Sequence, residues 1–142
     1  MENYGFIRVS AAVPKVKAAG VDYNKEEIIS MIDKAEADRV SVIVFPELSV
    51  TGYTCGDLFG QQLLIQKAEE AVKSIREHTR GKSLTVVVGA PVNFRNKLYN
   101  CAVVIRGGLI RGLVPKSHIS SSGGFHEPRY YEIGRASCRE RV

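Results

Sequence analysis

Hydrophobic positions along the chain predict alternating strands and helices over the first 90 residues. Three apolar runs, at 6–13, 40–45 and 84–88, have the length and composition of buried strands. The run at 40–45 is apolar at nearly every position, as a strand that is covered on both faces requires. Between these runs, apolar residues recur at helical spacing, which predicts amphipathic helices at about 25–38 and 61–79.

Local signals refine the edges of these elements. Asn24 stands directly before the first predicted helix and Glu27 at its third position, as in a capping box, so we expect Asn24 to cap that helix. Pro14 ends the first strand. The segment 46–60, between the second strand and the second helix, is too long for a simple turn, which indicates a functional loop.

The pattern changes after residue 97. Two further apolar runs, at 98–105 and 109–114, are separated by Arg106, Gly107 and Gly108, which is typical of a tight hairpin. A strand–helix–strand–helix–strand order followed by a meander predicts an α/β fold whose sheet is of mixed direction with flanking helices.

Composition limits the class of protein. A chain of 142 residues with 44% hydrophobic content is long enough for one domain with a real core. Its three cysteines show no paired spacing, which argues against a disulfide framework or a zinc site, so we expect no metal. We find no secretory leader at the start and no apolar run long enough for a membrane helix. These features favour a cytoplasmic protein without a membrane partner.

Charge adds little to this picture. The formal net charge is +5, but the Lys and Arg residues are scattered and no aromatic residues alternate with them, so we expect no nucleic-acid partner. Residues 132–142, "EIGRASCRERV", have no apolar period and resemble the translated read-through of a sequencing adapter. We therefore divide the chain into a domain segment, 1–131, and a non-native tail, 132–142.

Polar residues follow several predicted strands. Glu47 comes after the second strand, Asn93 and Arg95 after the third, and Lys116 after the fifth. Ligand and catalytic sites of open α/β sheets gather at such strand ends. Taken alone, Glu47 could equally cap the next segment, and Lys116 is a typical surface lysine. Together, a carboxylate and an ammonium could serve as general base and oxyanion partner, although the pair lacks a nucleophile.

Longer motifs carry a resemblance. The segments "VFPELSVTGY" at 44–53 and "PKSHI" at 115–119 resemble the nitrilase, or carbon–nitrogen hydrolase, superfamily. The runs "GYTCGDLFGQQLLIQKAEEAV" and "GAPVNFRNKLYNCAVVIRGGLIRGLVPK" are similar to the glutaminase domain of glutamine-dependent NAD synthetases. The resemblance covers about 5–131. It implies the nitrilase-like α-β-β-α sandwich, of which this chain would supply a partial domain.

The resemblance also implies roles for particular residues. In a Glu–Lys–Cys triad, Glu47 would be the general base and Lys116 would stabilise the oxyanion. Glu127 would be the supporting carboxylate, while Tyr53 and Phe125 would line the pocket for glutamine and ammonia. The family's nucleophilic cysteine would lie beyond the end of this chain. We expect Cys55, although close to Glu47 in sequence, to be an ordinary loop cysteine, because nothing beside it resembles a nucleophile elbow.

The implied activity is hydrolysis of glutamine to supply ammonia to a C-terminal synthetase domain. ATP and Mg²⁺ would belong to that missing domain, so we expect no cofactor in this chain, which alone would be inactive. The complete protein would form a homo-oligomer. Two alternatives stay open, namely a free-standing amidase or carbamoylase of the same superfamily, and a non-catalytic α/β binding module in which Glu47 and Lys116 form a structural pair. The sequence downstream of Tyr131 would separate them.

Overall fold

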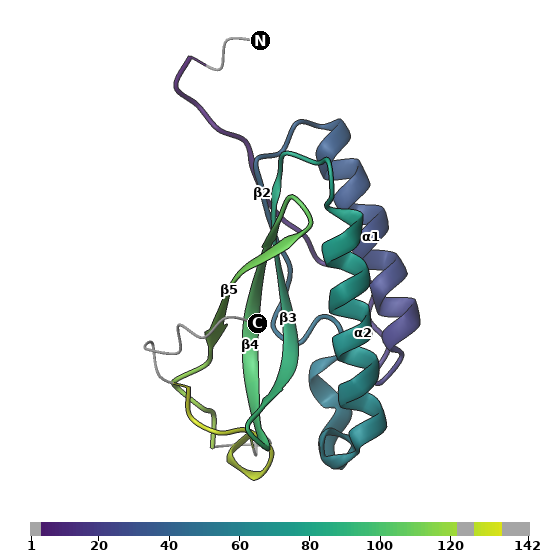
Figure 1. Ribbon diagram of the computed structural model, residues 1–142, viewed down its shortest axis with the longest axis vertical. Coiled ribbons are helices and arrows are strands. Elements are labelled where there is room, and N and C mark those ends of the chain that lie inside the picture. The colour runs from purple at the N-terminus through teal and green to yellow at the C-terminus, as the bar shows by residue number, and fades with distance from the viewer. Residues whose placement is uncertain (1–3, 122–126, 135–142) are drawn as a thin grey trace.

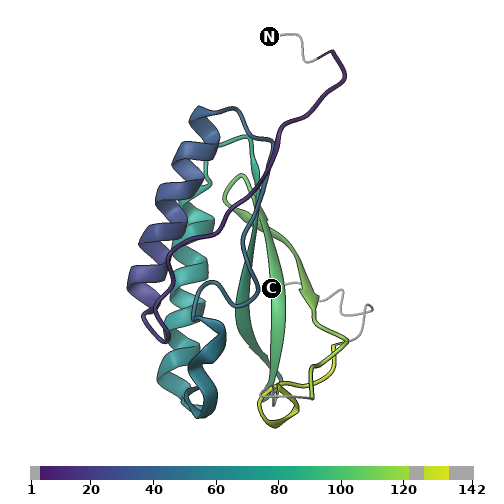
Figure 2. The ribbon, with the colours of Figure 1, turned by 180° about the vertical axis from the view of Figure 1, so that it is seen from behind.

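The fold has two layers, a sheet and a pair of long helices that cover one of its faces (Figure 1). The computed structural model describes residues 4–121 and 127–134. Seen from behind, the N-terminal segment crosses the molecule before it enters the first helix (Figure 2). Within the described residues, no helix combines the length and apolar character that crossing a membrane would need.

The elements follow the order expected from the hydrophobic pattern. The strands are β1 (Val9–Ala11), β2 (Val42–Val44), β3 (Thr85–Phe94), β4 (Lys97–Arg106) and β5 (Leu109–Pro115). The helices are α1 (Val21–Ala37) and α2 (Gln62–His78), with short 3₁₀ helices η1 (Tyr53–Gly60) and η2 (Glu127–Arg129).

The sheet is of mixed direction, as predicted. Its strands lie in the order β1-β2-β3-β4-β5. The pairs β1–β2 and β2–β3 are parallel, whereas β3–β4 and β4–β5 are antiparallel. Strand β3 is therefore the boundary between a parallel half, which is linked by helices, and an antiparallel meander.

The core lies between the sheet and the helices. Ile43, Val86, Val88, Val103 and Ile105 alternate along β2, β3 and β4 and are at most 1% exposed. They pack in one cluster with apolar residues of both helices, among them Ile28, Ile32, Ala68, Ala71 and Ile75. Because side chains alternate across a strand, the residues between them face away from the helices.

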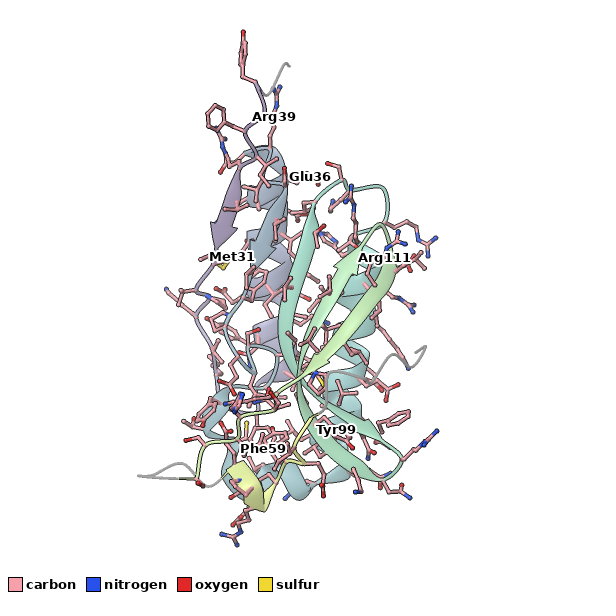
Figure 3. All side chains as sticks on the ribbon, turned by 90° about the vertical axis from the view of Figure 1, so that its left-hand side faces the viewer. Met31, Glu36, Arg39, Phe59, Tyr99 and Arg111 are labelled. Carbon is pink, nitrogen blue, oxygen red and sulfur yellow. The ribbon has the colours of Figure 1, made fainter. Side chains whose placement is uncertain are left out.

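That second face is apolar and uncovered by the described residues. The register places Val9, Val44 and Val87 on it, together with Val104 and Val114. Val9 is 63% exposed, Val44 44% and Val114 60%. Figure 3 looks onto this side of the sheet, with the helices behind it. The chain thus supplies one sheet and one helical layer, which are half of the expected sandwich.

Two local predictions were wrong. Asn24 does not cap α1, because the helix begins at Val21, with Gly20 at the N-cap position. Asn24 is instead fully buried, and its amide bonds the backbone of Lys17 and Val50. Strand β3 also continues past residue 88 to Phe94 and turns at Arg95–Asn96, where both φ angles are positive, as a two-residue hairpin requires.

The second hairpin is confirmed. Gly107 and Gly108 connect β4 to β5 with φ angles of 60° and 78°, a left-handed conformation that glycine adopts without strain. The extension of β3 changes the interpretation of Asn93 and Arg95. Both are exposed and lie at a hairpin, away from the carboxyl end of β2, so they do not contribute to the candidate site.

Candidate functional site

Glu47 sits in a tight turn that follows β2. The ladder continues for one residue beyond the strand, because the Phe45 amide donates to the carbonyl of Val87 at 2.9 Å. Leu48 then takes a φ of 52° and is buried, which turns the chain and leaves the Glu47 side chain 42% exposed. The turn thereby presents a carboxylate at the end of an otherwise apolar strand.

This turn is fastened to the neighbouring strand β3. The Gly89 amide donates to Ser49 Oγ at 3.3 Å, and the Val50 amide donates to the Gly89 carbonyl at 3.1 Å. A Cβ at Gly89 would lie 2.6 Å from the carbonyl oxygen of Pro46. The absence of a side chain at Gly89 therefore lets the turn that carries Glu47 lie directly on the sheet.

Lys116 approaches Glu47 from the meander. It follows β5 immediately, and its amide donates to the Asn100 carbonyl at 2.7 Å. Its Nζ lies 2.7 Å from Glu47 Oε1 and 2.9 Å from Glu127 Oε1. One ammonium thus bridges two carboxylates that are 80 residues apart in sequence, as 127 minus 47 gives.

Glu127 is the most enclosed member of this group. Its side chain is 5% exposed and accepts hydrogen bonds at both oxygens. Tyr53 Oη donates to Oε1 at 2.6 Å, and the Ser120 amide donates to Oε2 at 2.9 Å. Glu127 therefore joins η1, the segment after β5, and η2 around the Lys116 ammonium.

The charges of this group stabilise one another. Burial disfavours the charged form of Glu127, but hydrogen bonds from Tyr53, the Ser120 amide and Lys116 outweigh it and lower the pKa of Glu127. Burial likewise opposes the charge of Lys116, yet its bonds to Glu47 and Glu127 raise the pKa of Lys116. Burial and the bond to Glu127 raise the pKa of Tyr53 to about 12. At neutral pH the site therefore holds charged Lys116 and Glu127 beside a neutral phenol.

An aromatic contact holds η2 against η1. Phe59 packs on the rings of Tyr130 and Tyr131, with centroid distances of 5.9 Å and 5.1 Å. Tyr130 Oη also donates to Asp57 Oδ1 at 3.0 Å. Figure 3 labels Phe59 beside the short helix η2. These contacts fix the segment from which Glu127 reaches Lys116.

Cys55 has a structural role and is not an activated nucleophile of this site. Its thiol is buried and donates to the carbonyls of Thr51 and Gly52, at 3.1 Å and 3.4 Å. Burial raises the pKa of Cys55, which is the opposite of what an activated thiolate needs. Cys101 is buried in β4 as well. Among the described residues, no group of three or more His, Cys, Asp or Glu side chains could hold a metal ion.

The described chain also has a groove away from this group of residues. It has a volume of about 320 Å³ and runs between the start of α1 and the start of α2, lined by residues that include Gly20, Tyr23, Leu64 and Lys67. None of Glu47, Lys116 or Glu127 lines it. The candidate site is instead an open group of polar residues at the edge of the sheet.

The structure brings together four of the residues that the sequence singled out: Glu47, Lys116, Glu127 and Tyr53. Phe125 lies outside the described residues. Asn100 was missed, although its amide Nδ2 donates to Glu47 Oε1 at 2.5 Å. The signal was a polar residue within the apolar run "LYNCAVVI".

Residues 132–134 lie against the meander. The Glu132 amide donates to the Leu98 carbonyl and the Gly134 amide to the Lys116 carbonyl, both at 2.8 Å. Residues 135–142 lie outside the described part of the chain. That 132–142 form a non-native tail stays a prediction.

Comparison with known proteins identifies relatives of this chain. The chain is 33% identical over 132 residues to the "Glutamine-dependent NAD(+) synthetase" of Mycobacterium leprae, covering 93% of this chain and 19% of that protein. It is 36% identical over 114 residues to the protein of the same description from Aquifex aeolicus, covering 80% and 20%. The chain thus spans about a fifth of the length of these curated relatives.

Solved structures are similar to this chain as well. A glutamine-dependent NAD(+) synthetase from Cytophaga hutchinsonii superposes with a TM-score of 0.87 at 26% identity, covering 92% of this chain and 22% of that one. An amidase from Nesterenkonia sp. superposes with a TM-score of 0.79 at 15% identity, covering 91% and 48%, which supports the fold alone. The profile described as "Carbon-nitrogen hydrolase" matches residues 8–140. With this match over most of its length, the chain belongs to the carbon–nitrogen hydrolase family.

Proposed function

We propose that this chain is the N-terminal part of a glutaminase domain that releases ammonia from glutamine for ATP-dependent synthesis of NAD from nicotinic acid adenine dinucleotide. The observation that carries the proposal is the Lys116 ammonium, which lies within 3 Å of both Glu47 and Glu127. The names of relatives at 33% and 36% identity support glutamine as the source of ammonia.

In this proposal Glu47 is the general base. A cysteine from outside this chain supplies the thiol, and Glu47 takes its proton as the sulfur attacks the amide carbonyl carbon of glutamine. Lys116 lies beside Glu47 and offers a fixed positive charge to the oxyanion that forms. Glu47 then returns the proton to the leaving nitrogen, ammonia departs, and water hydrolyses the thioester.

Glu127 and Tyr53 support this chemistry without exchanging protons in it. Glu127 accepts a second hydrogen bond from the Lys116 ammonium, and its lowered pKa keeps it ionised at neutral pH. Tyr53 donates to Glu127 and, with Phe125, is proposed to line the pocket for glutamine and ammonia. The arrangement leaves Glu47 as the exposed carboxylate that a thiol can reach.

The synthetase reaction needs a further domain. We propose that ATP and Mg²⁺ bind there and not to the residues described in this chain. A structure of an Acinetobacter baumannii glutamine-dependent NAD+ synthetase contains adenosine diphosphate, which fits a nucleotide site in such proteins. We also propose that the complete enzyme is a homo-oligomer. We propose a cytoplasmic location, because the buried thiols of Cys55 and Cys101 suit a reducing compartment.

The experiment compares two nitrogen donors in the full-length protein, in which the gene is continued past Tyr131. NAD formation from glutamine and from free ammonium should both occur, with glutamate released only from glutamine. Hydrolysis of simple amides without NAD formation would instead identify an amidase. Absence of hydrolysis with any amide would leave the ion pairs of Lys116 as a structural feature.

A further inference from the structure

Asn100 is buried in β4 and contacts both the candidate base Glu47 and its partner Lys116. Its exposed fraction is 3%, and its side-chain amide Nδ2 donates to Glu47 Oε1 at 2.5 Å. Its carbonyl accepts the amide of Lys116 at 2.7 Å. One strand residue therefore sets the position of the Glu47 carboxylate through its side chain and that of Lys116 through its backbone.

The two oxygens of Glu47 differ in their partners. Oε1 accepts from Asn100 Nδ2 and from Lys116 Nζ, at 2.5 Å and 2.7 Å. Oε2 accepts no hydrogen bond from the described residues. Two donors on one oxygen fix the plane of the carboxylate and occupy that oxygen, so Oε2 keeps its lone pairs available.

We propose that Asn100 is a positioning residue that holds Glu47 Oε1 against Lys116 and thereby makes Oε2 the oxygen that accepts the proton of the nucleophile. This inference rests on the proposed function, because it assigns the path of the proton in that reaction. The S–H proton passes to Oε2 as the S–C bond forms. The same proton passes from Oε2 to the amide nitrogen as the C–N bond breaks, so ammonia leaves neutral and the carboxylate is restored.

The geometry distinguishes this role from that of an ordinary buried amide. Asn24 is also fully buried, and its side chain bonds only backbone groups of Lys17 and Val50. The side-chain amide of Asn100 instead donates to the carboxylate of Glu47, which is 42% exposed. Asn24 therefore serves as a matched control for the loss of a buried amide that contacts neither Glu47 nor Lys116.

The test uses the full-length protein and the variants Asn100→Ala, Asn100→Asp and Asn24→Ala. Active-site titration with a thiol-reactive glutamine analogue counts the competent sites, so that kcat is expressed per competent site. We expect Asn100→Ala to lower kcat for glutamine about 10- to 100-fold, because a misplaced catalytic group costs rate at unchanged binding. KM should stay within about twofold, and NAD formation from ammonium should persist. Asn24→Ala should reduce the competent fraction and leave kcat per site unchanged.

Asn100→Asp keeps the size of the side chain, so it provides the test if Asn100→Ala does not fold. It removes the donor and places a second carboxylate beside Glu47, and we expect a loss of kcat at least as large. Unchanged kcat per site in either folded Asn100 variant would overturn the inference, as would an equal loss of the ammonium-dependent reaction. A wild-type protein that does not hydrolyse glutamine would instead refute the proposed function, whatever the variants do.

Discussion

The backbone of Gly89 on β3 lies directly against the two peptide groups that flank Glu47. A Cβ at Gly89 would lie 2.6 Å from the Pro46 carbonyl oxygen, 2.9 Å from the Glu47 carbonyl carbon, and closer still to the Leu48 amide nitrogen. All three are backbone atoms, so no side-chain rotation could make room. The position of Glu47 therefore depends on a glycine in a different strand.

Gly89→Ala should displace the turn that carries Glu47. We expect the free energy of unfolding of the complete domain to fall by about 1 to 3 kcal/mol, the usual cost of overpacking, and glutaminase activity to fall with it. Gly112→Ala on β5 is the control, because a Cβ there meets nothing within 4 Å. Urea unfolding and glutamate release measure the two effects. Equal behaviour of the two variants would refute this account of Gly89.

Glu47→Gln should abolish the use of glutamine in the full-length protein. Glutamine keeps the size of the side chain but cannot accept the thiol proton, and a lost general base costs about 10²- to 10⁴-fold in rate. NAD formation from free ammonium should continue. Glu70→Gln, an exposed position on α2, is the control. If Glu47→Gln lowered both reactions equally, Glu47 would be a structural residue.

Lys116→Met should remove glutaminase activity as well, by about 3 kcal/mol of transition-state stabilisation or more. The variant also leaves Glu127, which is 5% exposed, without its ammonium partner, so the domain should lose stability. Lys73→Met, which breaks an exposed ion pair with Glu69 on α2, is the control. Near-normal glutamine turnover by Lys116→Met would contradict the triad.

Glu127 should make the domain sensitive to acid. The folded-state pKa of Glu127 lies below its ordinary value, so its contribution to stability is complete above that ordinary value and is lost as pH falls through the folded pKa. In urea unfolding of the complete domain between pH 3 and 7, the stability lost in Glu127→Gln should be largest near neutrality and shrink toward pH 3. A loss independent of pH would show that packing, not charge, is the contribution.

The 142-residue chain alone should be catalytically inactive and should self-associate. It holds Glu47, the proposed base, and Lys116, but the thiol of Cys55 is buried and donates to backbone carbonyls. The open face of the sheet exposes apolar residues such as Val44 and Val114, and large exposed apolar patches drive association. Size-exclusion chromatography should show oligomers, which Val44→Lys with Val114→Lys should reduce. Glutamine turnover by a monomer, lost in Cys55→Ala, would contradict this prediction.

Much of this arrangement was predictable from the sequence because it depends on long patterns. The apolar period located α2 within one residue at each end, and Gly107–Gly108 located the second hairpin. The limits of β3 were not predictable in this way, because the turn at Arg95–Asn96 carries no glycine. The capping pattern at Asn24 failed because burial against Val50 outweighed the local preference for a cap.

The site itself was only partly predictable. Glu47 and Lys116 interrupt apolar runs at strand ends, which made them visible. Asn100 and Gly89 act through contacts with residues far away in sequence. Asn100 stands out as a polar residue within an apolar run, but that pattern does not identify Glu47 as its partner. Glu127 became a candidate only through the family resemblance, since its segment shows no apolar period.

Strand β3 joins the parallel half of the sheet to the antiparallel meander. This arrangement has a consequence for the order of folding. Three of the hydrogen bonds that assemble the site join residues 53, 69 and 74 positions apart, for Asn100–Glu47, Lys116–Glu47 and Tyr53–Glu127. Closing such long loops has a large entropic cost, whereas the two hairpins close locally. The hairpins should therefore form early and the charged group late. A nascent chain would then bring Glu47, Lys116 and Glu127 together only after both halves of the sheet have docked.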